Sequence, residues 1–90
     1  MTLLCRNRVQ DFSRGKAVLD SHAQAHRNAG LHLKSIWQAI GDPDNVFFLF
    51  ELAEENKARE FISNPFAAKA AKTSGVLDGE YHFLESTVGY

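Results

Sequence analysis

Residues 31–52, LHLKSIWQAIGDPDNVFFLFEL, set the topology of this 90-residue chain. The first part, 31–39, alternates in polarity, as a strand with one drier and one wetter face does. A break follows at 41–45, where Asp, Pro and Asn residues supply turn chemistry. Residues 46–52 then carry apolar side chains on both faces, which is typical of a strand covered from both sides. The pattern predicts a β-hairpin.

The alternation also predicts which face of the sheet each hairpin side chain occupies. In the second strand, Phe47, Leu49 and Glu51 should point away from the helices. In the first strand, the drier face, which a helix should cover, is predicted to hold Leu31, Leu33, Ser35 and Trp37, and the wetter face His32, Lys34, Ile36 and Gln38.

Two helical stretches flank the hairpin. Residues 12–29 follow a helical period, with Asp11 at the N-cap position and Gly30 where a residue of positive φ can end a helix. Residues 54–72 are also helical in pattern, but Asn64-Pro65 predicts a split there, because proline is tolerated only in a helix's first turn. The first helix should turn one face to the sheet, made of Phe12, Gly15, Leu19, His22, Ala23, His26 and Ala29.

Strands at 2–9 and 80–86, the latter preceded by a loop with Gly75 and Gly79, complete a β-α-β-β-α-β order. This order predicts an α+β, ferredoxin-like fold over residues 1–90, with a four-stranded antiparallel sheet and both helices on one face. The other face would expose an apolar patch. We therefore expect a homodimer in which two sheets pack face to face. The patch residues are Ile36, Phe47, Leu49 and Leu84.

Composition narrows the partners and the compartment. The net charge of −1, with both signs interspersed, gives no basic stripe for nucleic acid and no polybasic run for a membrane surface. No apolar run approaches the roughly 20 residues that span a bilayer. The single cysteine, Cys5, excludes an internal disulfide, and the N-terminus lacks the apolar run of a signal peptide. We expect a soluble, cytoplasmic protein.

Several short pieces of sequence, in this order and spacing, form a recognisable pattern over nearly the whole chain. They are Asp11-Phe12 with Lys16, Leu19-Asp20-Ser21-His22, Ala29-Gly30-Leu31, Asp42-Pro43 with Val46, Phe50-Glu51, Phe61 with Asn64-Pro65, and Gly75-Val76 with Phe83-Leu84-Glu85. On these pieces the chain resembles the dimeric α/β-barrel superfamily, typified by small antibiotic-biosynthesis monooxygenases, and in particular its uncharacterised cyclase-like members. It departs from the family pattern at Gly15, where relatives tend to carry an aromatic residue, and at His26, where they tend to carry arginine.

Such families contain cofactor-independent oxygenases, isomerases, haem-degrading proteins and members without known activity. The resemblance therefore implies a fold and a pocket, and it does not select one reaction.

The first candidate site lies under the first helix. His22 and His26 are four residues apart, a spacing that lets two imidazoles share a metal, but the glutamate of an H-E-x-x-H motif is absent and we expect no metal. His22 falls in the family pattern and is the candidate general base, while His26 could line the pocket. Gly15 either faces a cavity or is covered by a bulky neighbour such as Trp37.

The second candidate site is the wetter sheet face, where Arg6, His32, Glu51 and His82 could orient a polar ligand inside the barrel. The alternative is that these charged residues hold the dimer together, with Glu51 paired to Arg6 or Lys34.

Two functions stay open. One is a cofactor-independent enzyme, of monooxygenase, isomerase or cyclase type, that acts on a small aromatic or polyketide-like compound. The other is a non-catalytic small-molecule-binding or stress-related dimeric module. A Ser/His/Asp constellation and a glycine-rich phosphate loop are missing, which disfavours hydrolase and nucleotide chemistry.

Overall fold

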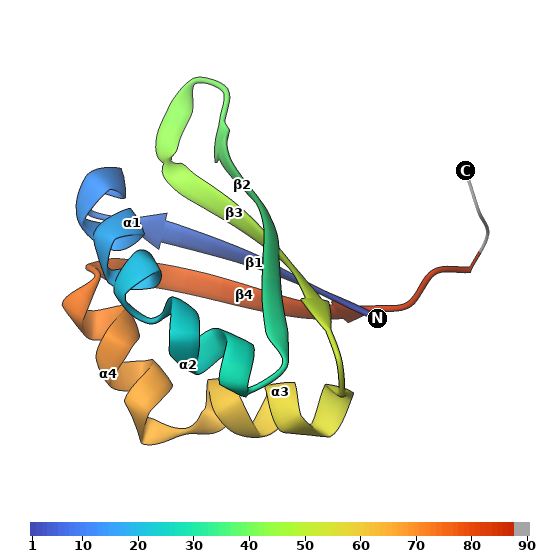
Figure 1. Ribbon diagram of the computed structural model, residues 1–90. Helices are drawn as coiled ribbons and strands as arrows, with labels where there is room; N and C mark the ends of the chain where they lie inside the picture. The colour runs from blue at the N-terminus through green and yellow to red at the C-terminus, as the bar shows by residue number, and fades with distance from the viewer. Residues whose placement is uncertain (88–90) are drawn as a thin grey trace.

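Four antiparallel strands form a sheet in the order β2-β3-β1-β4 in the computed structural model, which describes residues 1–87. The helices lie together on one face of this sheet (Figure 1). This arrangement confirms the predicted ferredoxin-like fold. The elements are β1 (Thr2–Val9), α1 (Phe12–Ser21), α2 (Ala23–Asn28), β2 (Leu31–Ala39), β3 (Asp42–Leu52), α3 (Glu55–Ser63), α4 (Pro65–Thr73) and β4 (Val76–Leu84).

The core lies between the two inner strands and the helices. Alternate side chains of β1 and β3 are buried on the helix side, and Leu3 of β1 pairs directly with Phe50 of β3. Because neighbouring side chains on a strand point to opposite faces, the same register puts Phe47 and Leu49 on the outer face, as predicted. The buried apolar residues are Leu3, Cys5, Val9, Leu31, Val46, Phe50, Leu52 and Ala58.

The first helical stretch begins and ends where the sequence predicts. The Asp11 carboxylate accepts a hydrogen bond from the Arg14 N–H at 3.3 Å, and Gly30 has a φ of 77°. The stretch is not one helix, however, because it bends at His22, whose φ and ψ are −102° and 10°. The bend lets α1 pack against β3 and α2 against β2.

The second helical stretch is split at Asn64-Pro65, as predicted. Helix α3 ends at Ser63, and Pro65 is the first residue of α4. The Asn64 side chain accepts a hydrogen bond from the Phe66 N–H at 2.8 Å and thereby caps α4. Proline has no N–H to leave unpaired at this position.

The hairpin turn lies earlier than predicted. Ile40 and Gly41 make the turn, and residues 42–45 belong to β3. The shorter turn is feasible because Gly41 takes a φ of 83°. Strand β4 likewise starts earlier, at Val76, so Gly79 lies inside the strand, opposite Asn7, rather than in a loop.

A β-bulge changes the faces predicted for β2. Leu33 pairs with Phe50 and Ser35 pairs with Leu49, so Lys34 is an extra residue with no counterpart on β3. Beyond the bulge every side chain is on the face opposite to the one predicted. Ile36 therefore faces the helices, and Trp37, paired with Phe47, lies on the outer face.

Among residues 1–87, no helix is long and apolar enough to cross a membrane.

Candidate functional site

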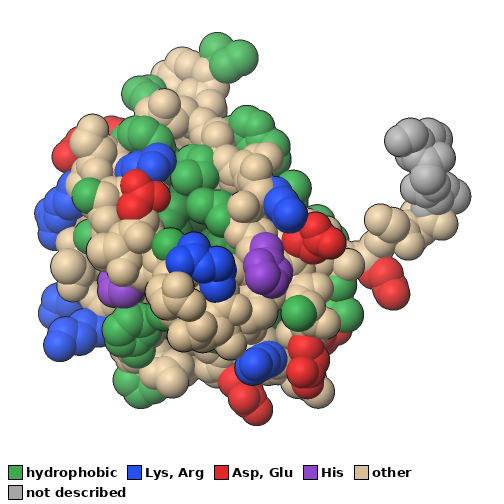
Figure 2. Space-filling view, in the orientation of Figure 1, with side chains coloured by type: hydrophobic (Ala, Val, Ile, Leu, Met, Phe, Trp, Pro, Cys, Tyr) green, Lys and Arg blue, Asp and Glu red, His purple; other side chains and the backbone are tan. Residues whose placement is uncertain are grey.

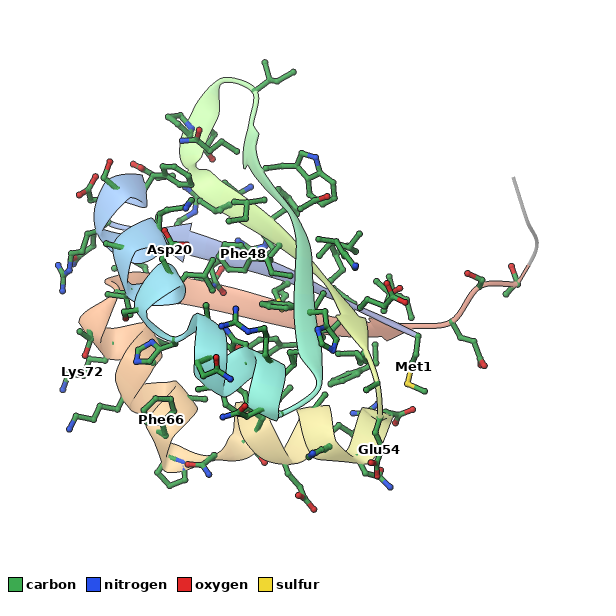
Figure 3. The ribbon with its side chains drawn as sticks, in the orientation of Figure 1. Met1, Asp20, Phe48, Glu54, Phe66 and Lys72 are labelled. Atoms are coloured by element: carbon green, nitrogen blue, oxygen red, sulfur yellow. The ribbon has the colours of Figure 1, made fainter. Side chains whose placement is uncertain are left out.

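A cavity of about 120 Å³ lies between the helix layer and the sheet. Figure 2 shows hydrophobic side chains at the bottom of a hollow in the molecular face, with charged side chains around it. Phe48, on β3, lies in this region between α1 and β2 (Figure 3). The apolar lining comes from every layer and includes Leu3, Val9, Phe12, Leu19, Ile36, Val46, Phe48, Phe50, Phe61 and Ile62.

The space is open because two helices present small residues to it. Gly15 of α1 has no side chain, and α4 contributes Ala67, Ala70 and Ala71. The alternative that Trp37 fills the space beside Gly15 is wrong, because Trp37 is on the outer face and 48% exposed. A Cβ added to Gly15 would lie 3.6 Å from the Ser74 carbonyl oxygen and 3.7 Å from Val9 Cγ1, which are ordinary contact distances.

His22 and His26 both line this cavity. The His22 ring packs edge-on against Phe66, with 5.0 Å between ring centroids, and the His26 ring lies 5.4 Å from both Phe50 and Phe61. In residues 1–87, neither imidazole hydrogen-bonds to a protein group. Their ring nitrogens are therefore free to bind a ligand.

The surroundings of His26 favour its neutral form. Burial against the phenylalanine rings lowers the pKa of His26, and the neighbouring His22 lowers it further. A neutral imidazole can accept a proton at physiological pH.

The cavity includes polar residues that we did not select from the sequence. Asn7 of β1 and Tyr81 of β4 face it, and burial raises the pKa of the Tyr81 hydroxyl. The sequence could have pointed to Asn7, because it is the one polar residue on the otherwise apolar face of β1. Cys5 is buried there as well, and desolvation raises the pKa of its thiol to about 12, so the sulfur stays protonated and unreactive.

The structure separates the second group of predicted site residues from this cavity. Arg6, Glu51 and His82 have register positions on the outer face. Arg6 is bound within its own chain, 2.8 Å from Asp78 and 3.0 Å from Glu80.

Hydrogen bonds from Arg6 lower the pKa of both Asp78 and Glu80. Glu51 pairs with Lys34 at 3.7 Å, which was one of the two predicted partners, and His82 lies 3.2 Å from Glu80. These contacts hold the charges within one chain.

His32 pairs with Glu51 across β2 and β3, so it also has a register position on the outer face, as predicted. It lies on the edge strand β2 and lines a groove beside α1 and α2, together with His26. In the described part of the chain, no cluster of three or more His, Cys, Asp or Glu side chains could hold a metal ion.

No protein-family model matches the sequence, and no curated protein matches it. Solved structures do match the fold. One is a predicted antibiotic biosynthesis monooxygenase from Bordetella bronchiseptica, with a TM-score of 0.76 and 12% identity over 97% of this chain and 96% of that one. Another predicted monooxygenase, from Bacteroides thetaiotaomicron, has a TM-score of 0.70 and 17% identity over 98% of this chain and 90% of that one.

A third match is a variant of SnoaB, a cofactor-independent oxygenase from Streptomyces nogalater. Its TM-score is 0.70, with 11% identity over 99% of this chain and 96% of that one. Each of these matches covers 97% or more of this chain. The chain therefore has the ferredoxin-like α/β fold of the antibiotic biosynthesis monooxygenases.

Proposed function

We propose that the protein is a cofactor-independent enzyme that binds a small aromatic compound in the cavity and removes a proton from it with an imidazole base. The observation that carries this proposal is the pair of histidines, His22 and His26, in an apolar cavity with their ring nitrogens free of protein partners. An apolar pocket with a few converging polar groups is the usual form of a small-molecule site.

The volume limits the ligand. A cavity of about 150 Å³ in another protein binds benzene, and the cavity here measures about 120 Å³. The space therefore suits one aromatic ring. A multi-ring polyketide would have to extend out of the cavity or displace the helices.

The chemistry follows from the neutral imidazole. The base, His22 or His26, takes a proton from a ring hydroxyl or an activated CH₂ group, and the apolar walls exclude competing water. The substrate anion can then react with O₂. Conversion of CH₂ to C=O by O₂ releases one water molecule, and conversion of a 1,4-dihydroxybenzene to the quinone by O₂ releases one hydrogen peroxide. The SnoaB likeness supports O₂ as the co-reactant, since that protein is a cofactor-independent oxygenase of the same fold. Asn7 and Tyr81 could orient the substrate through hydrogen bonds.

One observation favours the alternative, a non-catalytic binding module. In residues 1–87, no carboxylate pairs with His22 or His26 to orient the ring or strengthen it as a base. A protein that only binds needs no such partner. Both functions use the same cavity, but only the enzyme converts its ligand to a product.

Oxygen uptake with 1,4-dihydroxybenzene, corrected for its spontaneous oxidation, separates them. If the protein is an enzyme, the rate of oxygen uptake should exceed the background rate. The His22→Asn, His26→Asn double variant should reduce this rate by roughly 100-fold or more, as for loss of a general base. His82→Asn, on the outer face, is the matched control and should keep the rate. Binding without uptake would support the alternative, and absence of binding would contradict both.

We also propose that two chains form a homodimer through their outer sheet faces. The support is the apolar surface there, where Trp37, Phe47 and Leu49 lie beside Leu4 and Leu84 and keep part of their area exposed. Burial of apolar area stabilises association by about 25 cal/mol per Å².

A further inference from the structure

The groove at the edge of the sheet adjoins the cavity. It measures about 340 Å³ and runs between the α1–α2 bend and β2. Leu19, His26 and Leu31 line both spaces. A ligand whose ring is in the cavity can therefore pass a substituent beside these residues into the groove.

The charges around the groove are not balanced. Asp20 is neutralised by Lys16, whose Nζ lies 2.7 Å from it. Lys34 is only loosely paired, 3.7 Å from Glu51. Arg27 has no carboxylate partner within residues 1–87, and its guanidinium donates to the Gln24 side-chain oxygen at 2.8 Å.

An arginine in this state can take up an anion. Its guanidinium is always charged and presents paired N–H donors that match the two oxygens of a carboxylate. The bond to Gln24 leaves other donors of Arg27 free, and Lys34 and His32 line the same groove. The apolar part of the groove lining comes from Leu19, Leu31 and Leu33.

We propose that the groove binds a carboxylate group on the aromatic ligand, with Arg27 as the cation that holds it. The substrate class is then an aromatic carboxylic acid, with its ring in the cavity and its acid group in the groove. This inference rests on the proposed function, because it needs the ring to occupy the cavity.

Benzoate and benzyl alcohol test the inference, because they have the same ring and nearly the same size but differ in charge. Their affinities are measured by NMR titration of the folded full chain. Benzoate should bind more tightly than benzyl alcohol. Arg27→Gln should weaken benzoate by about threefold to tenfold, as for loss of one partly exposed charge pair, and leave benzyl alcohol unchanged.

Two further variants make the test specific. Arg27→Lys should recover part of the benzoate affinity, since it restores the charge without the paired geometry. Lys57→Gln removes an equal charge from the exposed surface of α3 and should not change either affinity. Raised salt should weaken benzoate and spare benzyl alcohol.

The outcomes separate this inference from the proposed function. Equal affinities for benzoate and benzyl alcohol, or benzoate binding that Arg27→Gln leaves unchanged, would overturn the carboxylate site and leave the aromatic cavity in place. Binding of neither compound would overturn both.

Discussion

Among single residues, His26 both packs against the core and lines the proposed ligand site. It packs on Phe50 and Phe61 at the base of the helix layer, so its charged form is poorly solvated. The same burial that keeps the ring neutral also couples the fold to pH.

This coupling gives a prediction for stability. The pKa of His26 is lower in the folded chain than its unfolded value of about 6.5. Below that value the unfolded chain binds more protons, so the contribution of His26 to the free energy of unfolding falls as the pH drops through about 6.5. It levels off below the folded pKa.

Urea unfolding of the wild type and His26→Gln between pH 5 and 8 checks the prediction. The wild type should lose more stability than the variant on acidification. Parallel pH profiles for the two proteins would contradict the burial assigned to His26.

Among the secondary-structure elements, the break between α3 and α4 depends on a helix cap made by one side chain. Asn64 caps α4 through the Phe66 N–H. Asn64→Ala should lower the free energy of unfolding by about 1 kcal/mol, the usual cost of losing such a cap.

Asn56→Ala, within the exposed part of α3, is the control for the change in composition and should not destabilise the protein. If the two variants have equal stability in chemical unfolding, the side chain of Asn64 does not cap the helix.

Features with local causes could be predicted from the sequence. Asp11 capping, the stop at Gly30 and the split at Asn64-Pro65 each depend on a few neighbouring residues. The bulge at Lys34 has no comparable local signal, because it is set by how β2 pairs with β3. The single extra residue in β2 puts Trp37 and Ile36 on the sheet faces opposite to those predicted.

The same division applies to the candidate site. Gly15, His22 and His26 share a helix face, and the helical period alone puts them together. Asn7 and Tyr81 come from strands far apart in sequence, so their meeting at one cavity depends on the strand order. The bulge is the reason that the alternation puts Trp37 on the wrong face. The contacts of Arg6 and His82 with Glu80 depend on strand pairing, which the local sequence does not reveal.

For the molecule as a whole, the outer face of the sheet predicts a dimer. Light scattering at micromolar concentration should give twice the monomer mass for the wild type. Leu49→Glu puts a charge into the proposed interface and should give a monomer that melts cooperatively, because an unpaired charge is costly to bury.

Ala68→Glu adds the same charge to the exposed side of α4 and should remain a dimer. A wild-type monomer, or equal masses for the two variants, would show that the sheets do not pack face to face.

The cavity between the layers is the proposed ligand site, and Gly15 is one of the small residues that line it. The measurement is calorimetric titration of phenol into the wild type, Gly15→Phe and Ala17→Phe. Phenylalanine at 15 should fill the cavity and abolish binding while the protein stays folded by circular dichroism. Ala17 is exposed on the same helix, and Ala17→Phe should bind phenol as the wild type does. Undiminished phenol binding by folded Gly15→Phe would contradict the assignment of this cavity as the ligand site.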